Sequence, residues 1–204
     1  MEKILFINAC VRPQSRTRRL AACVLETLQK KEGGVQEAMD PETVNPEEVN
    51  LEKEAVPALT GETLALRDRL LAEGKLDAPM FRYARQFAEA DVIVVAAPYW
   101  DLSFPASLKA YIEAITVTGV TFHYTPEGVP AGLCRAKQLI YVTTAGGFIG
   151  ENDFGFSYLK TMAQTFYGIQ NVTCIRAEGL DIVGMDEEAI LRKAEEEIRG
   201  ASFL

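Results

Sequence analysis

The residues Lys3-Ile-Leu-Phe-Ile-Asn-Ala9 and the loop Cys10-Val-Arg-Pro-Gln-Ser-Arg-Thr17 that follows them decide the fold. The first run is apolar almost throughout, which is typical of a strand buried on both faces of a parallel sheet. In residues 18–31, apolar side chains then recur at the spacing of one helix face. Because a buried strand, a loop and an amphipathic helix open a βαβ unit, these residues predict an α/β protein.

The rest of the chain continues this alternation of strands and helices. Further strands are expected at residues 35–39, 92–97, 137–143 and 171–177, and further helices at 61–73, 79–89, 105–116, 155–167 and 186–199. The segment 40–60 contains three prolines and many acidic residues, so we expect it to cross the surface without forming a site. The order predicts a five-stranded parallel sheet with helices on both faces, in a single domain spanning residues 1–204.

The composition is that of an ordinary globular protein. Of the 204 residues, 48% are apolar and 25% are charged, and this length suits one compact unit. The formal net charge of -8 argues against a nucleic-acid partner, because phosphate backbones bind surfaces rich in lysine and arginine. No apolar run is long enough to cross a bilayer, and the first residues lack the layout of a signal peptide. We therefore expect a cytoplasmic protein that does not enter the membrane.

The four cysteines are far apart in the sequence. None belongs to a Cys-x-x-Cys pair, and none has a histidine at metal-ligand spacing. Neither a zinc site nor an iron–sulfur cluster is expected. Isolated cysteines in such a chain are typical of reduced thiols that act as small apolar side chains, and here they are Cys10, Cys23, Cys134 and Cys174.

Three loops are expected at the same edge of the sheet. In open parallel sheets, ligands bind beyond the carboxyl ends of the strands, where the strand order reverses. The loops that leave the predicted strands there are residues 10–17, 98–105 and 144–153. A ligand site is expected where these loops meet.

The first loop has the features of a phosphate site. It leads into the amino end of a helix, where unpaired backbone N–H groups and the helix dipole favour an anion. Ser15 and Thr17 add hydroxyl groups, and Arg12 and Arg16 add positive charge. The loop has neither the P-loop sequence nor Gly-x-Gly-x-x-Gly, so a monophosphate fits better than a triphosphate or a dinucleotide. The alternative is that Ser15 or Thr17 only caps the helix.

The other two loops could border a planar ligand with aromatic side chains and let the backbone come close to it. Pro98-Tyr-Trp-Asp-Leu-Ser-Phe-Pro105 gathers aromatic side chains at the end of a strand, where they either border a planar ring or simply cover the sheet. Thr144-Ala-Gly-Gly147 has two glycines that let the backbone approach a ligand, although an ordinary turn uses the same pair. The coincidence of all three loops at one edge favours a ligand site.

With these segments in order, the chain resembles the FMN-dependent NADH-azoreductase and NAD(P)H-quinone oxidoreductase family, which has a flavodoxin-like, doubly wound fold. The resemblance covers nearly the whole sequence. Besides the first strand and its loop, it rests on Ala97-Pro98-Tyr99-Trp100, Leu108-Lys109-Ala110-Tyr111, Gly119-Val-Thr-Phe-His-Tyr-Thr125, Thr144-Ala-Gly-Gly147 and Ala177-Glu178-Gly179. No single motif is decisive, but their order and spacing together are specific.

The resemblance implies an FMN site built from all three loops. The phosphate would lie against Cys10 and Ser15-Arg16-Thr17, the ring along Pro98-Tyr99-Trp100-Asp101-Leu102, and its other polar edge against Thr144-Ala145-Gly146-Gly147. The chain departs from the family at Cys10, where serine is usual, at Asp101, where asparagine is common, and at Ala145, where some members have arginine. Because an inward carboxylate would disfavour a reduced flavin, we expect Asp101 to point its side chain away.

The resemblance also implies a reaction. NAD(P)H would reduce FMN and leave, and a quinone-like or azo aromatic acceptor would then take the electrons, in a ping-pong mechanism that needs no catalytic side chain. A homodimer is implied, with Tyr124 and Phe148 as the candidates beside the acceptor. His123 is either a surface or dimer-edge residue or a proton donor.

Two other functions stay open from the sequence. A flavodoxin-like electron carrier would use its acidic charge to dock a protein partner, although the extra aromatic content leaves room for organic substrates. A hydrolase would need a catalytic constellation, and the sequence offers one histidine with no visible Ser-His-Asp or metal set. The oxidoreductase hypothesis accounts for more of the sequence motifs than either alternative does.

Overall fold

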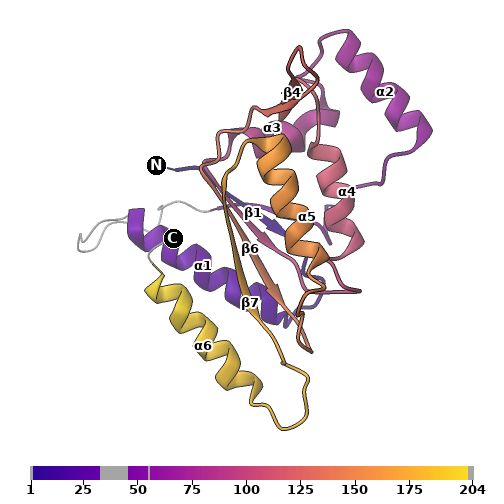
Figure 1. Ribbon diagram of the computed structural model, residues 1–204. Helices are drawn as coiled ribbons and strands as arrows, with labels where there is room; N and C mark the ends of the chain where they lie inside the picture. Colours follow the sequence, from indigo (N-terminus) through magenta and orange to yellow (C-terminus); the bar gives the residue numbers. More distant parts are fainter. Residues whose placement is uncertain (1, 33–45, 55, 202–204) are drawn as a thin grey trace.

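The computed structural model describes residues 2–32, 46–54 and 56–201. At its centre is a parallel sheet with the strand order β2-β1-β3-β6-β7 (Figure 1). The strands are β1 (Ile4–Asn8), β2 (Glu47–Asn50), β3 (Val92–Ala96), β6 (Gln138–Thr144) and β7 (Asn171–Ala177). Because β2 and β3 pair with opposite sides of β1, the strand order reverses between β1 and β3. The predicted five-stranded flavodoxin-like fold is confirmed.

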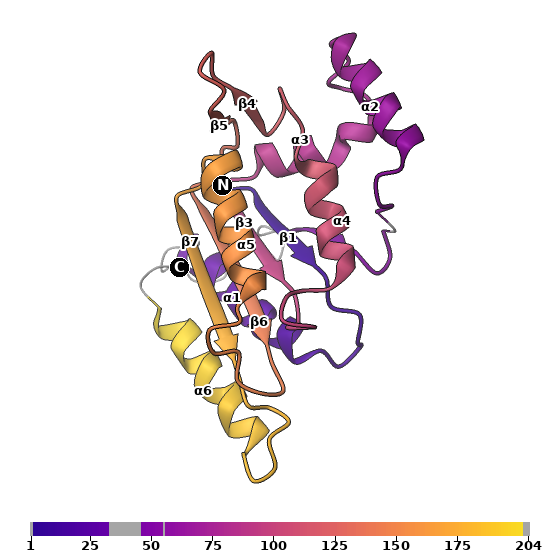
Figure 2. The same cartoon turned by 45° about the vertical axis from the view of Figure 1, so that its right-hand side comes forward.

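Helices cover both faces of the sheet, as Figures 1 and 2 show. The helices on one face are α1 (Arg16–Glu32) and α6 (Glu187–Gly200), and those on the other are α3 (Arg82–Glu89), α4 (Ala106–Ile115) and α5 (Phe154–Met162). This arrangement follows from right-handed crossovers between parallel strands. It leaves the carboxyl ends of the strands accessible between the two helical layers.

Two apolar layers result from the alternation of side chains along each strand. Leu5 and Ile7 of β1 belong to the layer beneath α3, α4 and α5, whereas Ile4 and Phe6 belong to the layer beneath α1 and α6. The strands β1, β3 and β6 are buried on both faces, which explains why each contains an unbroken run of four or more apolar residues. The core therefore holds the carboxyl ends of these three strands in place.

The second strand is not where the sequence indicates. The strand expected at 35–39 lies outside the described residues, and the expectation of an irregular segment over 40–60 is wrong for β2, which pairs in parallel with β1. In β2, Val49 is buried while both glutamates are exposed, as is typical of an edge strand. Asn8 of β1 donates a side-chain hydrogen bond of 2.8 Å to Glu48. Because exposed glutamates make up half of β2, its sequence lacks the apolar pattern by which a strand is recognised.

The remaining elements follow the predicted ranges with local changes. The helix expected at 79–89 is a short 3-10 helix, η1 (Pro79–Phe81), followed by α3. The helix expected at 155–167 is α5 followed by a π-helix, η2 (Ala163–Tyr167), and the chain leaves it at Gly168 with a φ of 78°. The turn-rich segment 122–132 forms an antiparallel hairpin of β4 (Phe122–Tyr124) and β5 (Pro130–Gly132).

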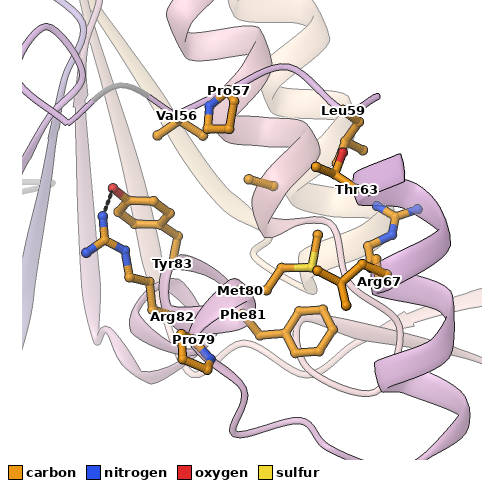
Figure 3. A pocket seen from close by; sticks show the side chains of 12 residues that line it. Val56, Pro57, Leu59, Thr63, Arg67, Pro79, Met80, Phe81, Arg82 and Tyr83 are labelled. Carbon is orange, nitrogen blue, oxygen red and sulfur yellow. Dashed lines mark hydrogen bonds between the residues drawn. The ribbon is translucent and has the colours of Figure 1, made fainter. Parts of the chain in front are cut away.

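Helix α2 (Gly61–Ala72) stands away from the sheet and has no buried residue (Figure 2). Between α2, η1 and α4 lies an apolar pocket of about 350 Å³, with Met80 and Phe81 on one side and Arg67 of α2 on the other (Figure 3). None of the site residues predicted from the sequence lines this pocket. It is therefore separate from the place where the three loops meet.

The cysteines form no cross-link and no metal site in the described part of the chain. All four carry free thiols, and no group of three metal-ligating side chains occurs there. Burial raises the pKa of Cys134 and Cys174 to about 12, so both thiols stay protonated near neutral pH. Among the helices of the described ranges, none combines the length and the apolar character needed to cross a membrane.

Candidate functional site

The three loops predicted from the sequence meet and line one cleft of about 430 Å³. The predicted residues that line it are Arg12, Ser15, Arg16, Thr17, Pro98, Tyr99, Trp100, Thr144 and Gly146. The other predicted residues of these loops adjoin them in the chain without lining the cleft, and they are Cys10, Asp101, Leu102, Ala145 and Gly147. The lining residues that the sequence did not indicate are Val11, Gln14, Asp181 and Glu187.

The first loop combines a helix cap with unpaired hydrogen-bond donors. Ser15 precedes α1, and its Oγ accepts a hydrogen bond of 3.2 Å from the backbone N–H of Arg18, so it caps the helix. Its hydroxyl group can also donate a hydrogen bond, either to the neighbouring thiol of Cys10 or to a ligand. The backbone N–H groups of Arg16 and Thr17 donate no hydrogen bond within the described residues, as is usual in the first turn of a helix. The loop can therefore cap the helix and bind an anion.

Thr17 connects the first loop to the third. Its side chain is buried, and its Oγ1 lies 2.6 Å from Oγ1 of Thr144 at the end of β6. Cys10, by contrast, is oriented toward the sheet, because its Sγ lies 3.7 Å from the carbonyl oxygen of Ala96 in β3. Burial is the largest of the influences that raise the pKa of this thiol. Thr17 is thus a wall of the cleft, and Cys10 belongs to the layer behind it.

The second loop makes a tight turn with an unusual backbone. Asp101 and Leu102 have φ angles of 49° and 67°, in the left-handed region that residues other than glycine rarely adopt. The flanking residues Trp100 and Ser103 exchange two backbone hydrogen bonds, of 3.0 and 2.8 Å. This geometry leaves the side chain of Asp101 exposed and outside the cleft, while Trp100 lines it. A strained turn that presents an aromatic side chain to a cleft is a common feature of binding sites.

The third loop is braced by the chain after β7. Asp181 donates its backbone N–H to the carbonyl oxygen of Gly146 at 2.9 Å, and Gly179 donates to Gly147 at 3.0 Å. The N–H groups of Gly146 and Gly147 themselves have no acceptor within the described ranges. Tyr99 ties the second loop to the third, because its backbone N–H donates to Thr144 at 3.0 Å. The unpaired amide of Gly146 is thereby held at the wall of the cleft, and that of Gly147 follows it in the chain.

An ion pair crosses the cleft. Arg16 Nη1 lies 2.8 Å from Oδ1 of Asp181 and 3.5 Å from Oε2 of Glu187. The hydrogen bond from Arg16 holds the pKa of Asp181 below its usual value. Sequence reasoning missed both acids, although one signal was present: Asp181 follows β7, whose carboxyl end lies at the same edge of the sheet as the three loops.

The residues expected beside the acceptor lie in different places. Phe148 lies in the third loop, directly after Gly147, and is 68% exposed. Tyr124 and His123 lie on the β4–β5 hairpin, which packs against Gly168, the residue that follows η2 before β7 begins. The hairpin is thus at the amino end of β7, away from the cleft (Figure 2). Within one chain the structure does not bring Tyr124 or His123 to the three loops.

Comparison with known proteins gives a consistent set of relatives. The family model described as flavodoxin-like fold matches residues 2–201. The chain is 41% identical to the FMN-dependent NADH:quinone oxidoreductase 2 of Clostridium acetobutylicum, over 98% of this chain and 97% of that protein. It is 38% identical to the FMN-dependent NADH:quinone oxidoreductase of Lachnoclostridium phytofermentans, over 96% of each.

A solved structure agrees with these relatives. The azoreductase from Bacillus anthracis strain Sterne is 28% identical to this chain and superposes on it with a TM-score of 0.80, covering 98% of this chain and 97% of that one. The resemblance predicted from the sequence motifs is confirmed. Because the family model and the relatives span nearly the whole chain, the protein belongs to the flavodoxin-like fold family that includes the FMN-dependent NADH:quinone oxidoreductases.

Proposed function

We propose that this protein is an FMN-dependent NAD(P)H oxidoreductase that reduces quinone-like or azo aromatic acceptors, with residues 1–204 forming one FMN-binding domain. The observation that carries the proposal is the cleft at the strand-order reversal. Its lining combines Trp100 with three residues whose backbone N–H groups have no acceptor in the described part of the chain, namely Arg16, Thr17 and Gly146. The relatives that cover nearly the whole chain are FMN-dependent NADH:quinone oxidoreductases, and a structural neighbour is an azoreductase.

The residues of the cleft fit the chemistry of FMN. The N–H groups of Arg16 and Thr17 and the hydroxyl of Ser15 would hold the terminal phosphate. Trp100 would border the ring, and the N–H groups of Gly146 and Gly147 would meet its polar edge. Ala145 replaces a charged side chain of some relatives, but it is buried against Ala177 by a backbone hydrogen bond of 3.0 Å. Ala145 therefore supplies neither a side-chain donor nor its backbone N–H to a ligand, and the unpaired donors of this loop are those of Gly146 and Gly147.

The bound flavin supplies the hydride and electron-transfer chemistry, and the chain binds and orients it. The Gly146-Gly147 loop is held by hydrogen bonds from Asp181 and Gly179, so its unpaired N–H groups would stabilise negative charge on a bound flavin without rearranging. Tyr99 and Trp100, which line the cleft, would shield part of the ring from water. Because one cleft would serve both NAD(P)H and the acceptor in turn, we infer a ping-pong mechanism with no side chain acting as acid, base or nucleophile.

Adding NADH or NADPH to the flavin-loaded protein without oxygen should bleach the flavin, and a quinone or an azo dye should then restore its colour. The reason is that the acceptor enters only after the nicotinamide has left. Stopped-flow absorbance measures both steps, and steady-state rates at several fixed acceptor concentrations should give parallel double-reciprocal lines. A flavin that stays oxidised with both donors contradicts the proposal and favours an electron carrier that needs a partner reductase.

We further propose a homodimer in the cytoplasm. Apolar side chains are exposed at three separate places on the chain, namely Leu64 and Leu66 of α2, Tyr124 of the hairpin and Phe148 beside the cleft, and a second copy would cover such surfaces. The hairpin that carries Tyr124 can approach a cleft only if that cleft belongs to another chain. Four free thiols suit a reducing compartment.

Light scattering of the purified protein should therefore give about twice the 22.5 kDa of one chain. The dimer should persist on dilution to micromolar concentration, because the exposed apolar area favours association. A mass of one chain at every concentration contradicts the proposal and would also leave Tyr124 without a role beside the acceptor.

A further inference from the structure

Asp181 occupies the part of the cleft where an anion is expected. Arg16 directs both terminal nitrogens at this carboxylate, with Nη1 2.8 Å from Oδ1 and Nη2 3.4 Å from Oδ2. Two guanidinium nitrogens facing two oxygens of one anion is also the arrangement with which arginine binds a phosphate. Asp181 therefore uses the donors that Arg16 would otherwise offer to a ligand.

The backbone holds Asp181 in this position. Its N–H donates to the carbonyl oxygen of Gly146 at 2.9 Å, and its Oδ2 lies 2.2 Å from the point where a side chain on Gly146 would begin. The carboxylate thus lies directly against the backbone of the third loop. Position 146 has no side chain to keep the carboxylate away from Arg16.

The charges that line the cleft cancel. Arg12 and Arg16 are the positive residues among them, and Asp181 and Glu187 are the negative ones. Arg16 contacts both acids, while Arg12 forms no ion pair within the part of the chain that the structure describes. The two arginines only match the two carboxylates, so the lining of the cleft carries no surplus of positive charge. A phosphate dianion that enters this cleft therefore finds Arg16 already paired with Asp181 and Glu187.

We propose that Asp181 competes with the flavin phosphate for Arg16, and so weakens the binding of FMN while leaving flavins without a phosphate unaffected. The inference rests on the proposed function, because the anion is the phosphate of FMN. When the phosphate enters, Arg16 exchanges the carboxylate of Asp181 for phosphate oxygens, and the freed carboxylate turns to water. This exchange is open to Asp181, because its side chain is 66% exposed, whereas that of Arg16 is 24% exposed.

The variant Asp181→Asn tests the competition. Removing one negative charge beside a phosphate dianion should tighten FMN binding roughly five- to tenfold at low salt, and the gain should shrink at high salt, because salt screens charges at the surface. Riboflavin, which has no phosphate, should bind the variant and the parent equally. Titration of the flavin-free 204-residue chain, followed by quenching of flavin fluorescence, measures both affinities without any turnover.

Glu188→Gln is the matched control. Glu188 is one residue from Glu187, but it pairs with Arg19 at 2.7 Å and does not line the cleft. This variant changes the net charge by the same amount, so it should leave the affinities for FMN and riboflavin at the parent values. In an Arg16→Ala background, Asp181→Asn should give a smaller gain, since the contested donor is gone.

The outcomes separate the inference from the proposed function. If the parent binds FMN and Asp181→Asn binds it no better, the competition is refuted while the flavin site stands. Weaker FMN binding by Asp181→Asn also refutes it, because Asp181 would then position Arg16 for the phosphate. If the folded parent binds neither flavin, the proposed function fails and the inference falls with it.

Discussion

Replacing Gly132 by alanine should lower the free energy of unfolding by about 3 kcal/mol, because the new methyl group meets backbone that cannot turn aside. A Cβ at Gly132 would lie 2.2 Å from the backbone nitrogen of Gly168 and from the carbonyl carbon of Tyr167. Unlike a flexible side chain, these atoms yield only if the hairpin separates from the end of η2. Urea unfolding followed by circular dichroism measures the change as a lower midpoint.

Gly61→Ala is the control for this substitution. Nothing lies within 4 Å of a Cβ at Gly61, and this residue begins α2. Alanine is favoured over glycine in a helix, so this variant should be as stable as the parent or slightly more stable. A Gly132→Ala protein that unfolds at the midpoint of the Gly61→Ala protein would show that the hairpin does not pack against η2 in solution.

Replacing both Ser15 and Thr17 by alanine should weaken FMN binding by about 2–5 kcal/mol, since each hydrogen bond to a charged group contributes about 1–3 kcal/mol. Both residues line the cleft at the first turn of α1. Riboflavin should lose much less, because both residues lie at the first turn of α1, where the phosphate would bind. Isothermal titration with both flavins compares the two losses directly.

Two further variants distinguish a loss of FMN affinity through missing hydrogen bonds from a loss through damage to the fold. Thr17→Ser keeps the hydroxyl that lies 2.6 Å from Thr144, so it should bind FMN nearly as well as the parent. Ser15→Ala alone removes the cap of α1 at a cost of about 1 kcal/mol in stability, which thermal unfolding registers separately from affinity. Equal binding of FMN by the double variant and the parent would mean that the phosphate lies elsewhere.

The elements that the sequence predicts well are those with a strong local pattern. The segments Ile4–Asn8, Val92–Ala96 and Gln138–Thr144 are buried on both faces, so their composition alone marks them as central strands. β2 has no such pattern. Its residues Glu47 to Asn50 become a strand through their pairing with Leu5 to Asn8 of β1, and tertiary pairing of this kind overrides intrinsic preference.

The residues of the site also differ in how well the sequence predicts them. The loops after β1, β3 and β6 were predictable, because the rule that ligands bind at the carboxyl ends of parallel strands needs only the strand order. The place of Asp181 depends on how the chain turns after β7, where Gly179 has a φ of 79°, and an acidic chain offers many other carboxylates. The position of Tyr124 likewise follows from the packing of the hairpin on Gly168, a contact that leaves no periodic trace in the sequence.

Within one chain, the exposure of α2 should let this helix open before the central strands of the sheet. This helix has a capping box at Thr60 and Thr63 but no buried residue, and only its partly buried Leu70 and Leu71 pack against the small apolar cluster around Phe81. Less free energy is therefore lost when α2 unravels than when a central strand of the sheet opens. Its backbone amides should therefore exchange with solvent deuterium far sooner than those of β1, β3 and β6. Because α2 contributes no residue to the cleft, a protease that cuts within it leaves the walls of the cleft joined through the sheet.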